Sequence, residues 1–219
     1  MSHVINIAEV DRDGAIQEAV HNLDGNTRAE LLRRGLIGGT AIFGGAALMG
    51  LPALASAAGG VSTKTVGILN YALTLEYLEA AFYAEGVSKG KLSGSLGRLA
   101  RTIAQHEQAH VDYLKKALGS AAVKKPKFNF KGTTSDPALF GATAYVLENA
   151  GVAAYSGQAT NIKEAAVVKA AVSILTVEAR HAGWIGAVIG KAPAPAAFDT
   201  AQSMSQILAA VKGTGFIVG

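Results

Sequence analysis

The chain has 219 residues, half of them hydrophobic, and a formal net charge of +4. This length is enough for one domain with a sizeable core. The sequence contains no cysteine, which excludes disulfides, thiolate metal sites and cysteine nucleophiles and suits an oxidising compartment. Residues of high helix propensity recur in long stretches between glycine- and proline-rich breaks, so we predict an all-α protein.

Residues 1–57 are predicted to form a leader outside the folded domain. Arg33 and Arg34 follow a polar stretch and precede an uncharged run, rich in glycine and alanine, that ends near Leu54. Paired arginines, a weakly hydrophobic run and the small-residue sequences "ALA" and "ASA" at its end are typical of a twin-arginine export signal. We therefore expect the twin-arginine export machinery as a partner and a location in the periplasm, the cell envelope or the medium. The alternative is an uncleaved membrane anchor, because the run is about long enough to span a bilayer.

Four long helices are predicted in a domain of residues 58–190, and a short fifth helix in a tail of residues 191–219. The long helices are expected at about Ser62–Glu85, from Ser93 or Ser95 to Leu118, at Pro137–Gly157 and at Thr160–Ile189. Asp136 is a good N-cap before Pro137, and a glycine follows three of the predicted ends. The fifth helix is expected at about Thr200–Val211, with Asp199 or Thr200 as its cap.

The connections between these helices predict how they pair. The first connection and the third are short, so each pair of helices is expected to form an antiparallel hairpin. Residues 119–135 connect the hairpins, and roughly 17 residues at about 3.3 Å each can run the full length of a bundle. Two hairpins with one long crossover are the arrangement of ferritin-like four-helix bundles. The basic sequence "KKPKFNFK" in this crossover is interpreted as a solvated loop, and no nucleic-acid motif is present.

Two sequence patterns occur once in each half of the domain. "LEYLEAAFY" (75–83) and "LENAGVAAY" (147–155) both begin with Leu-Glu and end with a tyrosine seven residues after the glutamate. "EQAHVDY" (107–113) and "EARHAGW" (178–184) both contain Glu-x-x-His with an aromatic residue three positions later. The halves therefore look like two copies of one helical hairpin.

The repeated acidic residues and histidines predict a metal site. In a helix, residues three apart share a face, so each Glu-x-x-His pair projects to one side. When the hairpins pack together, four carboxylates and two imidazoles meet at the middle of the bundle, where unneutralised charge is costly. Two divalent cations would balance four carboxylates and leave the histidines as neutral ligands. The predicted ligands are Glu76, Glu107, His110, Glu148, Glu178 and His181.

Residues 62–190 resemble the ferritin-like superfamily, in particular exported ferritin-like proteins related to plant desiccation-related proteins. The resemblance rests on "LEYLEAAFY", "HEQAH", "LENAGVAAY" and "VEARHAGW", together with the ending "AFDT…ILAAV". It implies an all-α, ferritin-like four-helix bundle with a short C-terminal helix. It also implies a non-haem centre of two iron ions, or of two manganese ions.

The leading functional hypothesis is a di-iron oxidoreductase outside the cytoplasm that acts on O2 or peroxide. Glu107 and Glu178 would bridge the two metals, and the other four ligands would each bind one metal. Ferroxidase, peroxide removal and manganese-catalase-like chemistry all fit these ligands. The alternatives are a non-catalytic metal-binding or desiccation-protective protein, and a homo-oligomeric cage that stores iron.

The sequence leaves the roles of several residues near the predicted ligands undecided. The repeat favours Glu76 over Glu79 as the ligand, and Glu79 is expected beside the site or at the edge of the bundle. His106 is expected to hydrogen-bond near the site, because Val177 occupies the matching position in the other half. The aromatic residues of the repeat could donate to ligands, carry oxidising equivalents or simply fill the core; they are Tyr83, Tyr113, Tyr155 and Trp184.

Overall fold

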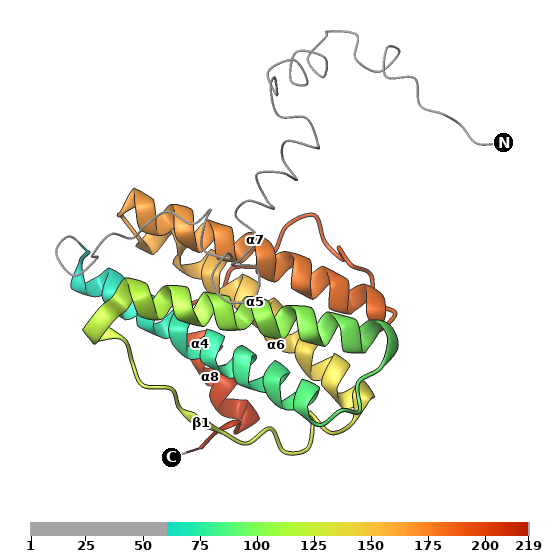
Figure 1. Cartoon of the computed structure of the whole chain (residues 1–219). Helices are drawn as coiled ribbons and strands as arrows, with labels where there is room; N and C mark the ends of the chain where they lie inside the picture. The colour runs from blue at the N-terminus through green and yellow to red at the C-terminus, as the bar shows by residue number, and fades with distance from the viewer. Residues whose placement is uncertain (1–60, 219) are drawn as a thin grey trace, which may run out of the picture. The chain divides into compact units, whose positions relative to one another are not determined.

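The computed structural model describes residues 61–218, so the predicted leader lies outside the described residues. Four long helices form a bundle (Figure 1): α4 (Thr63–Ser88), α5 (Gly94–Leu118), α6 (Pro137–Gln158) and α7 (Ala165–Val188). Helix α4 packs mainly against α5, and α6 against α7, while α4–α6 and α5–α7 contacts join the two hairpins. The predicted all-α bundle of two hairpins is confirmed. Between residues 61 and 218, no helix is both long and apolar enough to cross a membrane.

Local sequence signals place most helix ends where they were predicted. The Ser62 hydroxyl accepts a hydrogen bond from the Thr65 amide at 3.2 Å, and the Asp136 carboxylate accepts one from the Leu139 amide at 2.8 Å. Each bond satisfies one of the amides that a helix start leaves unpaired. Gly119 ends α5 with a positive φ of 54°, which a glycine adopts without strain.

Gly86 does not end α4, contrary to prediction, because it serves helix packing. The helix continues to Ser88. A Cβ atom added to Gly86 would lie 2.3 Å from Cε2 of Phe140, a fully buried ring of α6. Phe140 also stacks on Phe82 of α4, with ring centroids 4.8 Å apart. The missing side chain therefore lets a core ring of one hairpin approach the backbone of the other.

This packing gives a test with a control in the same helix. We expect Gly86→Ala to destabilise the fold by about 1–3 kcal/mol, since the new methyl group overpacks a full core. Gly67→Ala should stabilise it by up to ~1 kcal/mol, because Gly67 is helical with nothing near its added Cβ and alanine has the higher helix propensity. Urea unfolding of both variants measures the two effects; shifts of the same sign would contradict this account.

Helix α7 begins at Ala165, later than the predicted Thr160. Residues Ala159–Asn161 form a short 3-10 turn, η4, and Glu164 precedes the helix. The Glu164 carboxylate accepts hydrogen bonds from the Ser62 amide at 2.9 Å and the Thr65 hydroxyl at 2.8 Å. These bonds tie the start of α7 to the start of α4, and they depend on tertiary contact.

The fifth helix, α8 (Met204–Thr214), also begins later than predicted, with Ser203 as its cap in place of Asp199 or Thr200. The Ser203 hydroxyl accepts from the Gln206 amide at 3.3 Å, and the Gln206 side chain accepts from the Ser203 amide at 2.8 Å. This reciprocal capping box satisfies two amides at once, which a single cap residue does not achieve.

The crossover between the hairpins is held by the C-terminal segment. Strand β1 (Lys127–Phe128) pairs antiparallel with β2 (Ile217–Val218), as Figure 1 shows near the C-terminus. Next to this pair, the buried rings of Phe130 and Phe216 meet edge to face, with centroids 5.4 Å apart. The tail thus closes the core beneath the crossover.

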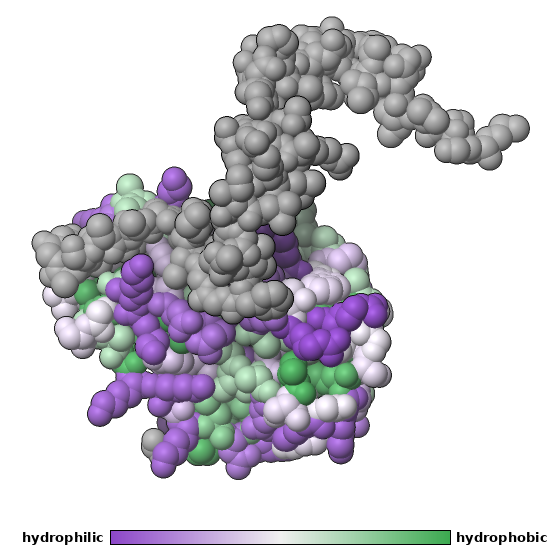
Figure 2. Space-filling view, viewed as in Figure 1, coloured by the Kyte–Doolittle hydropathy of each residue, from purple (hydrophilic) through white to green (hydrophobic). Residues whose placement is uncertain are grey.

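The surface shown in Figure 2 mixes hydrophilic and hydrophobic side chains, and the hydrophobic ones form small separate groups. All four lysines of the crossover are exposed, as expected for a solvated loop: Lys124, Lys125, Lys127 and Lys131.

Candidate metal centre

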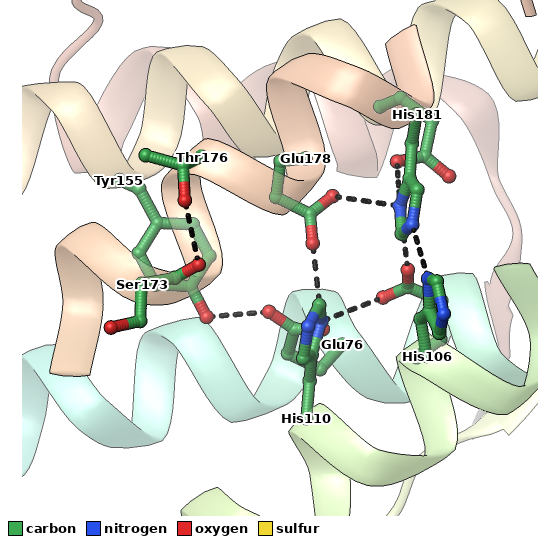
Figure 3. Close-up of polar contacts among 10 residues, drawn as sticks. Glu76, His106, His110, Tyr155, Ser173, Thr176, Glu178 and His181 are labelled. Atoms are coloured by element: carbon green, nitrogen blue, oxygen red, sulfur yellow. Dashed lines mark hydrogen bonds and ion pairs between the residues drawn. The ribbon is translucent and has the colours of Figure 1, made fainter. Parts of the chain in front are cut away.

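The middle of the bundle holds a buried cluster of acidic and imidazole side chains (Figure 3). All four long helices contribute to it: Glu76 comes from α4, Glu107 and His110 from α5, Glu148 from α6, and Glu178 and His181 from α7. The four glutamates have no exposed surface, and the two histidines are 8% and 3% exposed. The structure therefore brings together the six side chains that the sequence repeat singles out.

One half of the cluster surrounds His110. Its Nδ1 atom lies 3.1 Å from Oε2 of Glu76 and 3.1 Å from Oε1 of Glu178. Oε2 of Glu107 is 3.4 Å from the same nitrogen. These four residues offer ligand atoms that all lie within 4.8 Å of one another, close enough for one cation. We call this group the first position.

The other half surrounds His181 in the same way. Its Nδ1 atom lies 3.1 Å from Oε1 of Glu107 and 3.1 Å from Oε2 of Glu148. Oε2 of Glu178 is 3.9 Å away. These four residues form a second group within 4.8 Å, here called the second position. Glu107 and Glu178 belong to both groups, and each turns one oxygen toward each histidine, which is the geometry of a bridging carboxylate.

The electrostatics of the cluster call for positive charge. Among the described residues, both oxygens of Glu107, both of Glu178 and Oε1 of Glu148 are buried without a hydrogen-bond partner. Burial and the charge on Glu76 raise the pKa of Glu107 well above its usual range, and burial and the charge on Glu107 do the same to the pKa of Glu178. Such orphaned oxygens are costly unless protons or cations neutralise them. The donor set therefore fits divalent cations.

His110 and Glu76 form the most strongly paired part of the cluster. Burial opposes the charge on both, but the charge and hydrogen bond of His110 hold the pKa of Glu76 below its usual value. Burial alone would lower the pKa of His110. The charge on Glu76 and the hydrogen bonds with Glu107 and Glu178 outweigh it and raise this pKa well above its usual value. Without a cation, a proton on His110 supplies part of the missing positive charge.

His106 connects the second position to the surface. Its Nδ1 atom lies 2.9 Å from Nε2 of His181, and the two rings stack with centroids 5.2 Å apart. The His106 side chain is exposed, whereas His181 is buried. Partial burial and the nearby imidazoles lower the pKa of His106, which favours the neutral ring. A neutral His106 can accept a hydrogen bond from Nε2–H of His181, and this tautomer leaves Nδ1 of His181 free to bind a cation.

Glu79 lies beside the centre and not at the edge of the bundle, since it is 3% exposed. Its counterpart in the other half is Gly151, and a Cβ atom there would lie 3.4 Å from Oε1 of Glu79 and 3.3 Å from Oε2 of Glu178. The missing side chain thus makes room for an extra carboxylate. Burial and the charges on Glu178 and Glu148 raise the pKa of Glu79 well above its usual value, which favours the neutral acid.

The tyrosines of the repeat face the glutamate of the opposite hairpin. The Tyr155 hydroxyl donates to Oε1 of Glu76 at 2.5 Å (Figure 3). Tyr83 approaches Glu148 in the equivalent way, but its hydroxyl lacks the geometry of a full hydrogen bond. Burial and these carboxylates raise the pKa of both tyrosines well above the usual value, so both stay protonated. The donor role that the sequence left open is thus confirmed for Tyr155.

The aromatic residues that follow each Glu-x-x-His pair differ in their environment. Tyr113 is buried, at 6% exposure, and fills the core. Trp184 is 41% exposed, so neither a core role nor a donor role at the centre fits it. The repeat predicted equal status for the two residues, and this prediction is wrong for Trp184.

Comparison with known proteins supports the relationship that the fold suggests. Residues 64–191 match the sequence model of a family described as the ferritin-like domain, and this span is more than half of the chain. It includes all four long helices except the first residue of α4, and every residue of the two cation positions. A search of curated proteins finds no match. The chain therefore belongs to the ferritin-like domain family.

Proposed function

We propose that the cluster binds two divalent metal ions, with iron as the physiological metal, and that the protein oxidises Fe(II) with O2 or peroxide. The observation that carries this proposal is the set of buried, unpartnered carboxylate oxygens shared between two inward-facing imidazole nitrogens. Imidazole and carboxylate ligands suit iron, and manganese accepts the same donors. Two divalent ions also balance the four carboxylates of the two positions.

Each residue has a distinct part in this proposal. Glu76 and His110 would hold only the first metal, Glu148 and His181 would hold only the second, and Glu107 and Glu178 would bridge them. Bound iron would supply one electron per ion, so two Fe(II) and two protons convert one O2 to hydrogen peroxide. Tyr155 orients Glu76 through its hydroxyl, and Glu79, whose pKa is raised by burial, would add little charge to the centre.

An Fe(II) oxidation assay tests this function. Metal-free protein is loaded with Fe(II) without oxygen, then exposed to O2 or hydrogen peroxide while Fe(III) formation and O2 uptake are recorded. We expect turnover in the wild type and none in a Glu107→Gln/Glu178→Gln double variant. Tight metal binding without turnover would contradict the oxidation step and favour metals that only stabilise the bundle. Size-exclusion chromatography separates an iron-storage cage, which would elute far above one chain, from small assemblies.

His106 gives a further prediction about the second position. We expect His106→Ala to weaken binding of one of the two metals by about 10–100-fold, the effect typical of losing the partner of a metal-ligating histidine. His106→Gln, which keeps a hydrogen-bond acceptor, should restore much of the affinity, and Val177→Ala at the matching position should change neither site. Anaerobic titration calorimetry with Mn²⁺ resolves the two sites. Equal weakening of both metals by His106→Ala would contradict the assignment.

Export through the twin-arginine route is a separate part of the proposal. It is supported by Arg33 and Arg34 and by the weakly hydrophobic run that follows them. Replacing both arginines by lysine should retain the protein in the cytoplasm, as cell fractionation would show. N-terminal sequencing of the exported protein distinguishes a cleaved signal from a retained anchor.

A further inference from the structure

A small apolar cavity lies between α4, α6 and the first half of α7. Its walls include Ile68 and Leu75 of α4, Ala154 and Tyr155 of α6, and Ala171 of α7. It offers about 20 Å³ to a water-sized molecule, which is room for one small molecule and no more. Ala171 is the one lining residue that is not buried, so the cavity opens to the surface beside this side chain.

The cavity lies next to the first metal position. Leu75 is in its wall, and the following residue is Glu76. Tyr155 is also in the wall, and its hydroxyl donates to Oε1 of Glu76 at 2.5 Å, as Figure 3 shows. A molecule that contacts Tyr155 in the cavity is therefore one side chain away from a proposed metal ligand.

The chemistry of the walls selects the occupant. The surface that faces the cavity is entirely apolar, although Tyr71, Tyr155 and Gln158 are among its lining residues. Water and hydrogen peroxide need hydrogen-bond partners, which this surface does not offer, whereas dry apolar cavities of proteins accept uncharged atoms and molecules such as xenon. Molecular oxygen is small, forms no strong hydrogen bonds and dissolves better in apolar liquids than in water.

We propose that this cavity is a docking site for O2 beside the first metal position, an inference that rests on the proposed oxidation of Fe(II). Oxygen enters past Ala171, and the wall of Leu75 and Tyr155 separates it from Glu76. Hydrogen peroxide, which needs hydrogen-bond partners, does not dock in this cavity.

Xenon binding to the metal-free protein tests the cavity without any activity. We expect one xenon atom in the cavity of pressurised wild-type crystals, and none in Ala171→Leu, whose larger side chain fills the opening. Ala166→Leu is the matched control, since Ala166 is exposed on the same helix and does not line the cavity. It should keep the xenon atom. A wild-type cavity without xenon would overturn the proposal.

The Fe(II)-loaded protein tests the role of the cavity. In Ala171→Leu, oxidation by O2 should slow at least several-fold, while oxidation by hydrogen peroxide and the metal content stay unchanged. An unchanged O2 rate, or an equal loss with both oxidants, would overturn the docking role. If the loaded wild type reacted with neither oxidant, the proposed function would fail first, and xenon in the cavity would then mark an apolar site without a role for O2.

Discussion

Glu178→Gln is expected to have opposite effects on the metal-free and the metal-loaded protein. In the metal-free protein, glutamine removes a buried carboxyl group whose pKa is raised by burial and by neighbouring carboxylates, and whose ionisation at high pH costs stability. At pH 8 the variant should unfold at a higher temperature than the wild type, by an amount on the order of the 1–4 kcal/mol gained when buried ion pairs are replaced by uncharged residues. In the loaded protein, the same substitution removes an oxygen ligand of both positions.

Metal binding by Glu178→Gln should therefore fall by more than about 100-fold, since losing only the partner of a ligand already costs 10–100-fold. Glu79→Gln is the matched control, because Glu79 is equally buried and acidic but belongs to neither ligand group. It should keep both metals. Thermal unfolding with and without Mn²⁺, combined with calorimetry, measures both effects. Equal metal affinity in the two variants would show that Glu178 is not a ligand.

The metal-free protein is expected to lose stability as the pH rises from about 5 to 8, and the loaded protein is not. The pKa values of Glu79, Glu107 and Glu178 are raised well above the ordinary glutamate value of 4.5 by burial and mutual repulsion. Protons bound by these groups favour the folded state below that ordinary value, and this stabilisation is lost as the pH rises through the folded pKa values. The raised pKa of His110 acts in the same direction.

Glu76 acts in the opposite direction, because its pKa is lowered and its contribution is lost as the pH falls. Because this loss occurs below the ordinary glutamate value of 4.5, Glu76 does not oppose the loss of stability between pH 5 and 8. Metal ions replace the protons, which means that loading should release protons and that the difference in Tm between loaded and metal-free protein should widen with pH. At 1,000 times the Kd, bound metal adds about 4 kcal/mol. Parallel Tm curves between pH 5 and 8 would contradict this coupling.

The sequence predicted the bundle and the composition of its buried cluster because both depend on local rules that occur twice. The spacing of Glu-x-x-His places both side chains on one face of any helix, and the duplicated hairpin predicts that Glu76 and Glu148 oppose these pairs. Comparing the two halves also shows where they differ. Glu79 of the first hairpin corresponds to Gly151 of the second, and His106 corresponds to Val177. That the cluster binds metal stays a prediction.

Other features could not be predicted, because they depend on how the hairpins pack. Tyr155 reaches Glu76 of the other hairpin, a contact between residues 79 positions apart in the chain. Gly86 looked like a helix terminator, but its space is taken by Phe140. The start of α7 is set by hydrogen bonds that the Glu164 carboxylate accepts from Ser62 and Thr65 at the start of α4, about 100 positions away. Helix propensity carries no information about such partners.

Anomalous X-ray diffraction from crystals soaked in Mn²⁺ or Fe²⁺ tests the central claim most directly. Two peaks per chain should appear between Glu107 and Glu178, one next to Nδ1 of His110 and the other next to Nδ1 of His181. A cluster without anomalous density, or metal bound only at surface carboxylates, would contradict the dinuclear centre.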